Sequence, residues 1–194
     1  AGGWLSFARF MEQLLYAPGL GYYTAGARKF GAAGDFITAP EMTALFGQAL
    51  ARQVAQIMAA SVPVVLEVGA GSGRLAADLL LALEKANALP EHYFILDLSA
   101  DLRQRQQETI AAAVPHLLSR VAWLDRLPEQ FSGVVVANEL LDAMPAHVVA
   151  WRDDGIFERG VVLDGSGGFT WNERPATGAL LAAATETGEQ CSLP

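Results

Sequence analysis

Cysteine and histidine are scarce in this sequence. A single cysteine, Cys191, excludes a disulfide within the chain, so a reducing compartment is the expected setting. The three histidines have no metal-ligand spacing, and with Cys191 they form no zinc pattern. We therefore expect no bound metal. The histidines are His92, His116 and His147.

Long apolar runs and positive charges are scarce as well. No segment has the roughly 18 uninterrupted apolar residues of a membrane span, so we expect no membrane insertion. The 13 Lys and Arg residues face 21 Asp and Glu residues, which gives a net charge of -8. This balance argues against nucleic-acid binding and suits a small-molecule site or a basic protein substrate.

The hydrophobic content is high by comparison. Of the 194 residues, 52% are hydrophobic, which suits one globular domain with a sizeable core. The chain begins without Met and ends in GEQCSLP, so we expect a fragment that is incomplete at its C-terminus. Within a single domain, 1–194, we predict N-terminal helices and a lid loop in 1–60, a core of strands and helices in 61–150, and an added hairpin in 151–194.

Apolar strands alternate with amphipathic helices through the middle of the chain. This alternation predicts an α/β fold with a mostly parallel sheet and helices on both faces. Ahead of it, Ser6 is expected to cap a helix that stops at Pro18. The expected strands are 64–68, 93–97, 121–124 and 134–137, and the expected helices are 41–60, 75–86 and 102–113.

The pattern changes after Pro145 to β-rich runs separated by turns. Two glycine-containing turns, RDDG and DGSGG, separate the runs at 147–151, 156–163 and 169–171. This arrangement predicts an antiparallel meander. A helical pattern follows at 178–187.

Three glycines in five positions, Gly69, Gly71 and Gly73, lie within the stretch EVGAGSGRL. Such a cluster at the carboxyl end of a strand marks backbone that approaches a ligand closely. The dinucleotide fingerprint G-x-G-x-x-G is not met, because Arg74 occupies its third position. The spacing resembles the first motif of class I S-adenosylmethionine-dependent methyltransferases. A glycine-rich turn without a ligand is the alternative.

An acidic residue ends the next predicted strand. Asp97 in YFILDLS is placed to accept hydrogen bonds from ribose hydroxyls. Its alternative role is to cap the following helix, although Ser99 or Asp101 can cap that helix equally well. We predict that Asp97 is a ribose ligand.

Four further stretches carry a more specific resemblance. They read YAPGLGYY, GDFITAPE with a following FG, SADLR with Gln106, and NELLDAMP. With the glycine loop, they identify the chain as a member of the MidA family of class I S-adenosylmethionine-dependent methyltransferases, over about residues 7–161. That family includes the mitochondrial assembly factor for respiratory complex I, a protein arginine methyltransferase. The chain departs from it at Ala70 and Ser72, where Pro and Arg are usual, and at Asp97, which is commonly Glu.

The resemblance implies a Rossmann-like class I methyltransferase fold in which residues 61–150 are the cofactor-binding core. S-adenosyl-L-methionine is the implied cofactor and S-adenosyl-L-homocysteine the product. Glu67 would lie near the cofactor's amino group, and Phe36 would shield the cofactor from water. The implied cofactor-binding residues are Glu67, Gly69, Gly71, Gly73, Asp97, Leu98, Asp35, Phe36 and Asn138.

The resemblance also implies methylation of arginine on a protein, such as a subunit of respiratory complex I. Carboxylates match the planar guanidinium, and Glu139 and Asp142 can share one face of a helical turn. The alternatives are helix-start carboxylates favoured by the dipole, and an ordinary turn at 34–41. The implied catalytic residues are Glu139, Asp142 and Asn138, and the implied substrate contacts are Thr38, Glu41, Glu139 and Asp142.

Two other functions stay open at this stage. One is a non-catalytic assembly or interaction factor that keeps a cofactor-binding fold. The other is a nucleotide-dependent oxidoreductase, against which Arg74 counts. A bacterial cytoplasm is favoured over a mitochondrial matrix as the compartment. The target protein and the oligomeric state are not predicted.

Overall fold

The structure is a computed structural model and describes residues 3–24 and 38–191. It divides into two compact units: Ala27–Leu140, which we call the parallel unit, and Ala1–Gly26 with Leu141–Pro194, which we call the antiparallel unit. The N-terminal helix therefore groups with the C-terminal part of the chain. The expected single domain, with divisions near residues 60 and 150, stays a prediction.

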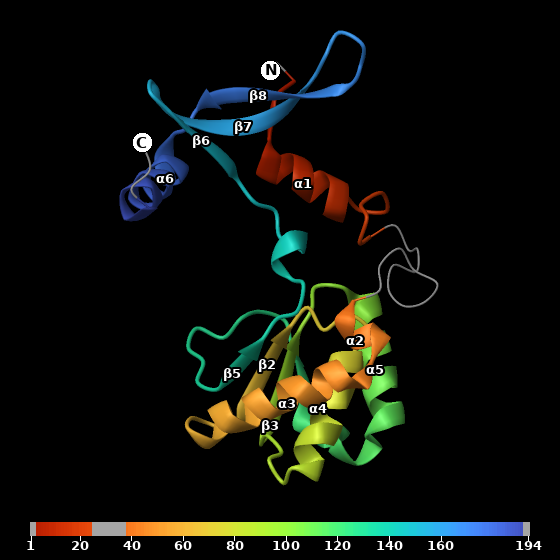
Figure 1. Cartoon of the computed structure of the whole chain (residues 1–194). Helices are drawn as coiled ribbons and strands as arrows, with labels where there is room; N and C mark the ends of the chain where they lie inside the picture. The colour runs from red at the N-terminus through yellow and green to blue at the C-terminus, as the bar shows by residue number, and fades with distance from the viewer. Residues whose placement is uncertain (1–2, 25–37, 192–194) are drawn as a thin grey trace. The chain divides into compact units, whose positions relative to one another are not determined.

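A parallel sheet forms the centre of the parallel unit (Figure 1). Its strands are β2 (Val64–Val68), β3 (His92–Leu96), β4 (Val121–Leu124) and β5 (Val134–Val136), in the order β4-β3-β2-β5. All neighbours are parallel, which confirms the prediction from the sequence. Strand order reverses beside β2, because β3 and β4 lie on one side of it and β5 on the other. Such a reversal opens a ligand crevice at the carboxyl ends of the strands.

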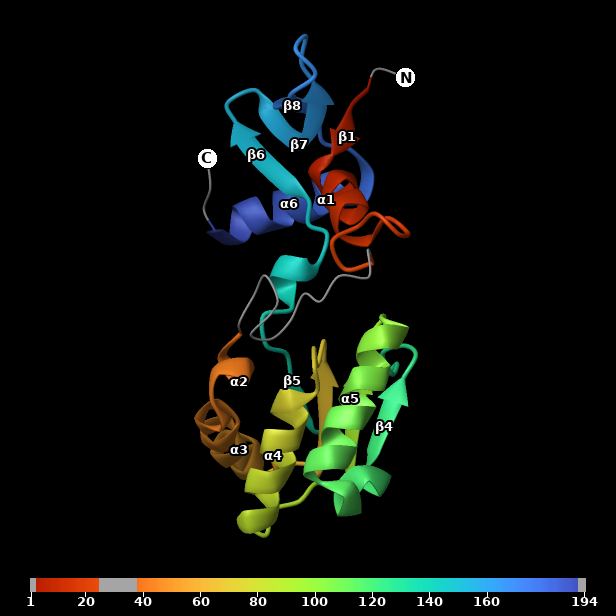
Figure 2. The same ribbon diagram turned by 90° about the vertical axis from the view of Figure 1, so that its right-hand side faces the viewer.

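Three long helices of this unit lie side by side on one face of the sheet (Figures 1 and 2). The two crossovers β2–α4–β3 and β3–α5–β4 run in the same direction, so right-handed connections place both helices on the same face. Helices were also expected on the opposite face, but within the described part of this unit none lies there. The helices are α3 (Ala44–Ala59), α4 (Arg74–Lys85) and α5 (Ala100–Ala113), with the shorter α2 (Ala39–Met42) and η1 (Pro115–Arg120).

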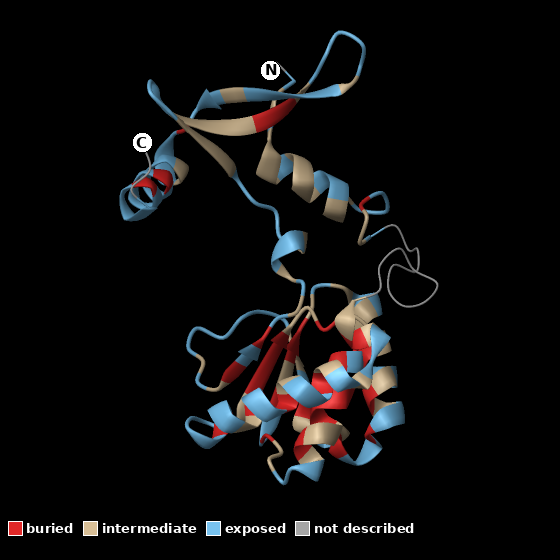
Figure 3. Ribbon diagram, in the orientation of Figure 1, coloured by how far each residue is buried: buried red, intermediate tan, exposed pale blue. Residues whose placement is uncertain are grey.

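Alternate strand residues fill the core beneath these helices (Figure 3). Because side chains alternate along a strand, Glu67 shares the helix-covered face with Val65. On β5 the opposite face is open, since Val135 is 58% exposed. The strand residues in the buried core cluster are Val65, Tyr93, Ile95, Val121, Val134 and Val136.

The helix expected from residue 41 to 60 begins later than predicted. Thr43 adopts extended backbone, with φ −162° and ψ 139°, and separates α2 from α3. Its hydroxyl accepts a hydrogen bond of 3.2 Å from the backbone N–H of Leu45, so Thr43 caps α3. Glu41 consequently lies on the separate short helix α2, whose own start carries Pro40.

The antiparallel unit contains the predicted meander. Strands β6 (Val148–Arg152), β7 (Gly155–Leu163) and β8 (Phe169–Pro175) pair in sequence, and β1 (Leu5–Ser6) adds a short strand to β7 that was not predicted. As expected, Ser6 caps helix α1 (Phe7–Tyr16), since its hydroxyl accepts from the backbone N–H of Arg9 at 3.2 Å. Helix α6 (Gly178–Cys191) confirms the helical pattern near the C-terminus.

None of the helices within residues 3–24 and 38–191 is both long and apolar enough to cross a membrane.

Candidate functional site

The glycine-rich turn joins the carboxyl end of β2 to the start of α4. Gly69, Gly71 and Gly73 all have positive φ, at 72°, 54° and 84°. Side chains with a Cβ avoid this left-handed region, so each of the three positions favours glycine for its backbone alone. The predicted turn is therefore present, and it lies at the strand-order reversal where ligands bind.

The surroundings of the three glycines differ. A Cβ on Gly73 would lie 2.8 Å from the Cα of Gln106, and one on Gly69 would lie 2.9 Å from Cδ1 of Leu140. A Cβ on Gly71 would meet no atom of the described structure within 4 Å. Gly73 is therefore needed for close helix packing, whereas Gly71 borders open space that a ligand can fill.

Alanine at these two positions is expected to separate packing from ligand binding. Gly71→Ala should lower the free energy of unfolding by only about 1 kcal/mol, the cost of left-handed backbone. Gly73→Ala adds a clash with the Gln106 backbone, so its loss should exceed about 2 kcal/mol. Urea unfolding of both variants checks this, and equal losses would contradict the difference in surroundings. Only Gly71→Ala should weaken ligand binding without a large loss of stability.

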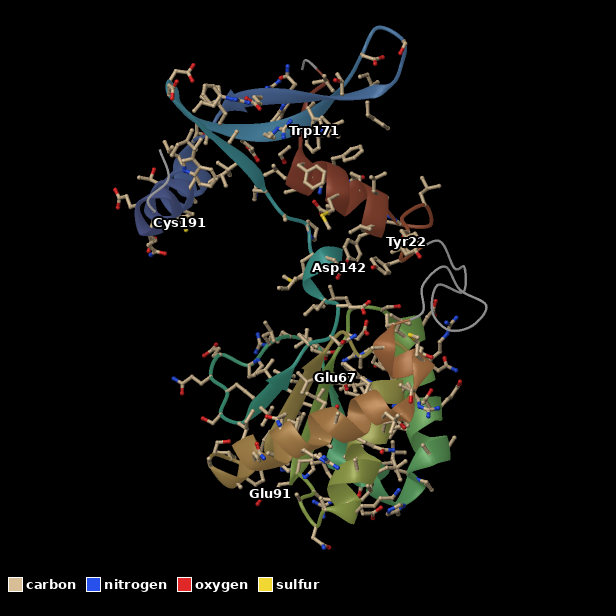
Figure 4. All side chains as sticks on the ribbon, viewed as in Figure 1. Tyr22, Glu67, Glu91, Asp142, Trp171 and Cys191 are labelled. Atoms are coloured by element: carbon tan, nitrogen blue, oxygen red, sulfur yellow. The ribbon has the colours of Figure 1, made fainter. Side chains whose placement is uncertain are left out.

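Glu67 lies beneath the turn, inside the sheet layer (Figure 4). Its side chain is only 2% exposed, and its Oε2 accepts a hydrogen bond of 2.6 Å from the hydroxyl of Tyr93. Burial raises the pKa of Glu67 to about 7, with a further contribution from the charge of Asp97, while the Tyr93 hydrogen bond opposes the rise. The carboxyl thus sits at the balance between its charged and neutral forms near neutral pH.

Asp97 follows β3 at the same edge of the sheet. Its Oδ1 accepts from the backbone N–H of Ser99 at 3.0 Å, and its Oδ2 accepts from Nε2 of Gln106 at 2.8 Å. Burial raises the pKa of Asp97, and these hydrogen bonds and the charge of Arg103 oppose the rise. Ser99 caps α5 by accepting from the N–H of Leu102 at 3.3 Å, which leaves Asp97 free of that task.

An apolar side chain stands beside this carboxylate. Leu98 is 88% exposed, although it is directly adjacent to Asp97 at the ligand edge of the sheet. Exposed leucines occur singly on many surfaces and need no explanation. At this position, however, Leu98 offers an apolar contact next to a hydrogen-bonding carboxylate, which is the combination that small-molecule sites use.

Gln106 connects the turn to Asp97 and was not predicted as a site residue. It is fully buried on α5, and its Nε2 donates both to Asp97 and, at 3.1 Å, to the carbonyl oxygen of Gly71. Its Oε1 accepts from Nε1 of Trp123, on β4, at 2.9 Å. The available signal was helical spacing: Gln106 stands four residues before the buried Ile110, so a polar residue occupies the apolar stripe.

Glu41 reaches the turn from α2. One of its carboxylate oxygens accepts from the hydroxyl of Ser72, in the middle of the turn. Arg74 begins α4 and donates from Nε to Asp78 at 2.9 Å. This hydrogen bond raises the pKa of Arg74, and the charges of Asp78 and Glu41 add to the rise. Thr38, also predicted to contact substrate, accepts through its carbonyl from the N–H of Glu41. The hydrogen bond between Glu41 and Ser72 attaches α2 to the glycine turn.

The segment after β5 lies beside the same turn through Leu140. Asn138 is half-buried and Glu139 is exposed. Glu139 has a φ of 49°, so its backbone is left-handed and cannot be part of a right-handed helical turn. The expected helical face shared with Asp142 is therefore not formed, because the short η2 (Leu141–Ala143) begins only after Glu139.

Asp142 belongs to the antiparallel unit, where Figure 4 labels it on η2. The hydroxyl of Tyr16 donates to the carbonyl oxygen of Ala143 at 2.6 Å and holds this short turn. The rings of Tyr16 and Tyr23 stack with centroids 5.5 Å apart. Burial raises the pKa of Tyr23, and the charge of Asp142 adds to the rise. Asp142 is thus exposed, close enough to Tyr23 for its charge to act on the hydroxyl of that residue.

Two predicted cofactor contacts, Asp35 and Phe36, lie outside the described residues. The described residues bring Glu67, the three glycines and Asp97 to one edge of the parallel sheet, as predicted. Among residues 3–24 and 38–191, no cluster of three or more His, Cys, Asp or Glu side chains is arranged to hold a metal ion.

Fold and turn together define a class of protein: a Rossmann-like cofactor-binding unit with a glycine-rich turn after its first strand and an acid after the next. A family model described as "Putative S-adenosyl-L-methionine-dependent methyltransferase" matches residues 49–192. The chain belongs to this family, which confirms the resemblance found in the sequence, the class of fold and S-adenosyl-L-methionine as the family's cofactor.

Individual relatives agree with this assignment. A structure from Burkholderia thailandensis, bound to S-adenosyl-homocysteine, is 52% identical with a TM-score of 0.82, and the match covers 95% of this chain and 49% of that one. "Protein arginine methyltransferase NDUFAF7 homolog, mitochondrial" of Caenorhabditis elegans is 30% identical over 75% of this chain and 39% of its own length. The Danio rerio protein of that name is 29% identical, over 84% and 44%. The chain thus spans about half or less of the length of these relatives.

Proposed function

We propose that this protein transfers a methyl group from S-adenosyl-L-methionine to an arginine side chain of another protein. The observation that carries the first half is the turn at Gly69–Gly73 joined through Gln106 to Asp97. A ligand there meets open space at Gly71 and a carboxylate at the end of the next strand. A relative that is 52% identical over 95% of this chain is bound to S-adenosyl-homocysteine, which supports the same ligand class here.

The residues present fit this cofactor. Asp97 can accept hydrogen bonds from the ribose hydroxyls, since its oxygens have lone pairs beyond those used by Ser99 and Gln106. Leu98 supplies an apolar surface, and Glu67 in its ionised form supplies a negative charge that suits a cationic amino group. Asp35, Phe36 and Asn138 complete the proposed set. When bound, the cofactor supplies an activated methyl group on a positively charged sulfur.

Binding of the methyl acceptor, an arginine side chain, depends in our proposal on the acidic segment that follows β5. A guanidinium needs carboxylates that match its planar fork and that concentrate charge away from the nitrogen to be methylated. We assign this role to Glu139, with Asn138, Thr38 and Glu41 of the same unit as further contacts. Strained left-handed backbone, as at Glu139, is found at functional sites because the surrounding structure must hold it.

The class of substrate is supported by relatives of about 30% identity named as protein arginine methyltransferases. The net charge of -8 suits a basic protein partner. We propose a respiratory complex I subunit as the substrate. The named relatives are mitochondrial and the solved structure is bacterial, so we propose the cytoplasm for a bacterial source and the mitochondrial matrix for a eukaryotic one.

Replacing the proposed acceptor carboxylate should stop turnover without preventing cofactor binding. Glu139→Gln removes the charge that orients the guanidinium, so methyl transfer should fall by at least about 100-fold. The affinity for S-adenosylhomocysteine should stay within about twofold, because Glu139 is not among the proposed cofactor ligands. Labelled S-adenosylmethionine is incubated with proteins from cells lacking the enzyme, and mass spectrometry locates the label. Glu129→Gln, an exposed carboxylate of the same unit, is the matched control.

The outcomes separate the two halves of the proposal. Label on arginine that is lost only in Glu139→Gln supports both halves. Label on another residue type would overturn the arginine assignment and leave the methyltransferase. Tight binding of S-adenosylhomocysteine without any transfer would favour the non-catalytic assembly factor.

A further inference from the structure

Gln106 makes contacts that no core-packing role requires. It is 0% exposed, and both ends of its amide are used: Nε2 donates to the Gly71 carbonyl and to Asp97, and Oε1 accepts from Trp123. The two acceptors on Nε2 belong to the turn after β2 and to the end of β3. One amide group therefore sets the spacing between two separate parts of the proposed cofactor site.

Trp123 fixes which way this amide faces. An indole N–H can only donate, so the atom of Gln106 that lies 2.9 Å from it must be the acceptor Oε1. The NH₂ group is then directed at Gly71 and Asp97, which both offer acceptors. A reversed amide would place Oε1 against a carbonyl and a carboxylate, with no hydrogen to share.

We propose that Gln106 is a positioning residue for the cofactor, that Trp123 fixes its orientation, and that the pair sets how tightly S-adenosylmethionine and S-adenosylhomocysteine bind. The proposal rests on the proposed cofactor site. Gln106 holds the Gly71 backbone in its open conformation and, by donating to Oδ2 of Asp97, keeps that side chain aimed toward the ribose. Neither Gln106 nor Trp123 needs to touch the ligand for this effect.

Only an amide satisfies these three contacts at once. Glutamine offers two N–H donors and one acceptor on adjacent atoms, and the site contains two acceptors and one donor. Glutamate offers no donor when charged and a single donor when protonated. Methionine has a similar length and no N–H, so it preserves the volume beside Gly73 and removes both donated bonds.

The first test is Gln106→Met. Losing a hydrogen bond to a carboxylate and one to the Gly71 carbonyl should weaken S-adenosylhomocysteine binding by about 10- to 100-fold in a calorimetric titration. Gln104→Met is the matched control, since Gln104 lies on the exposed side of α5, where its Nε2 donates to Glu108 at 3.0 Å. Its affinity should equal that of the wild type. Unchanged affinity in a folded Gln106→Met chain would overturn the proposal.

The second test separates positioning from packing by pH. In Gln106→Glu two carboxyl groups face each other, with Arg103 on α5 and Glu67 on β2 as the other charged groups acting on Asp97. The remaining neighbours, Trp123 from β4 and Gly73 at the start of α4, are neutral. Burial beside a like charge favours the protonated form of the new carboxyl, which can then donate to Asp97. The ratio of the dissociation constant of Gln106→Glu for S-adenosylhomocysteine to that of the wild type should therefore fall as the pH is lowered from 8 to 6.

If Gln106 only filled space, the loss of affinity in Gln106→Glu would not change with pH. Gln104→Glu places the same new charge on the exposed side of the helix and should show no such trend. A constant ratio of dissociation constants for Gln106→Glu between pH 6 and pH 8 would contradict the positioning role.

The third test uses Trp123 and does not depend on the folding of a single variant. Trp123→Phe in the otherwise wild-type chain should weaken binding several-fold, because Oε1 of Gln106 loses its hydrogen-bond donor and only the Nε2 contacts then hold the amide. In the Gln106→Met background the same change should have little further effect, since no amide remains to orient. Additive effects would overturn the proposed coupling. If the wild-type chain itself binds no S-adenosylhomocysteine, the proposed cofactor site fails, which is a distinct outcome from failure of Gln106.

Discussion

Replacing Asp97 with alanine is expected to weaken S-adenosylhomocysteine binding by at least about 100-fold, because two charge-assisted hydrogen bonds to the ribose are lost. Ser99 and Gln106 hold Asp97 in place for this proposed role, and Ser99 rather than Asp97 caps the following helix. Isothermal titration calorimetry at pH 7.5 measures the loss. The fold should survive, since the site of the change lies at the edge of the sheet and outside the buried core cluster.

Asp101→Ala is the control for this variant. Asp101 lies in the first turn of the same helix and is exposed, so its replacement removes the same charge without touching the proposed site. Asp97→Glu, which adds the one methylene that the family commonly has, should keep most of the affinity. Wild-type affinity in Asp97→Ala would show that the ribose binds elsewhere.

Replacing Glu67 with glutamine is expected to stabilise the chain at alkaline pH. Burial raises the pKa of Glu67 from 4.5 to about 7 in the folded state, so between these values the folded chain binds more protons than the unfolded one. The free energy of unfolding therefore falls as pH rises from about 5 to 8, and this one group accounts for about 3 kcal/mol of the decrease at about 1.4 kcal/mol per pH unit. Glutamine carries no charge and can still accept from Tyr93.

The measurement is urea unfolding of wild type and Glu67→Gln at intervals from pH 5 to pH 8.5. The variant should gain stability over the wild type only at the higher pH values, where the wild-type carboxyl must be ionised while buried. Glu91→Gln, an exposed carboxylate just before β3, should leave the pH dependence unchanged. If the free energy of unfolding depended on pH in the same way for wild type and Glu67→Gln, the proposed burial of an ionised Glu67 would be contradicted. Ionising the buried Glu67 thus lowers the stability of the fold. A carboxylate that is retained at a candidate cofactor site despite this loss fits a role in binding a cationic ligand.

Apart from the two-residue β1, the strands of both sheets were predictable because their patterns are local. Short β-branched runs such as 64–68 and 134–136 are bounded by glycine and polar residues, and the meander has two glycine turns. The break at Thr43 was not predicted, because a helical stripe continues through it and only the capping geometry shows the boundary. The placement of the helices on one face of the parallel sheet depends on the order of the strands, and no local sequence pattern indicates that order.

The candidate site was predicted where backbone conformation demands a residue type. Left-handed φ at Gly69, Gly71 and Gly73 accounts for the glycines, and the end of β3 accounts for Asp97. The contacts of Gln106 with Trp123 were not foreseen, because these residues meet only when α5 packs on the sheet. The left-handed Glu139 was also missed, since its spacing to Asp142 suggested a helical turn.

The most direct test of the account is a calorimetric titration of this chain with S-adenosylhomocysteine, with NADH as the competing ligand class. We predict micromolar binding of S-adenosylhomocysteine at a stoichiometry of one and no heat from NADH. Binding of NADH, or a folded chain that binds neither ligand, would contradict the assignment of the Gly69–Gly73 turn and Asp97 as a S-adenosylmethionine site.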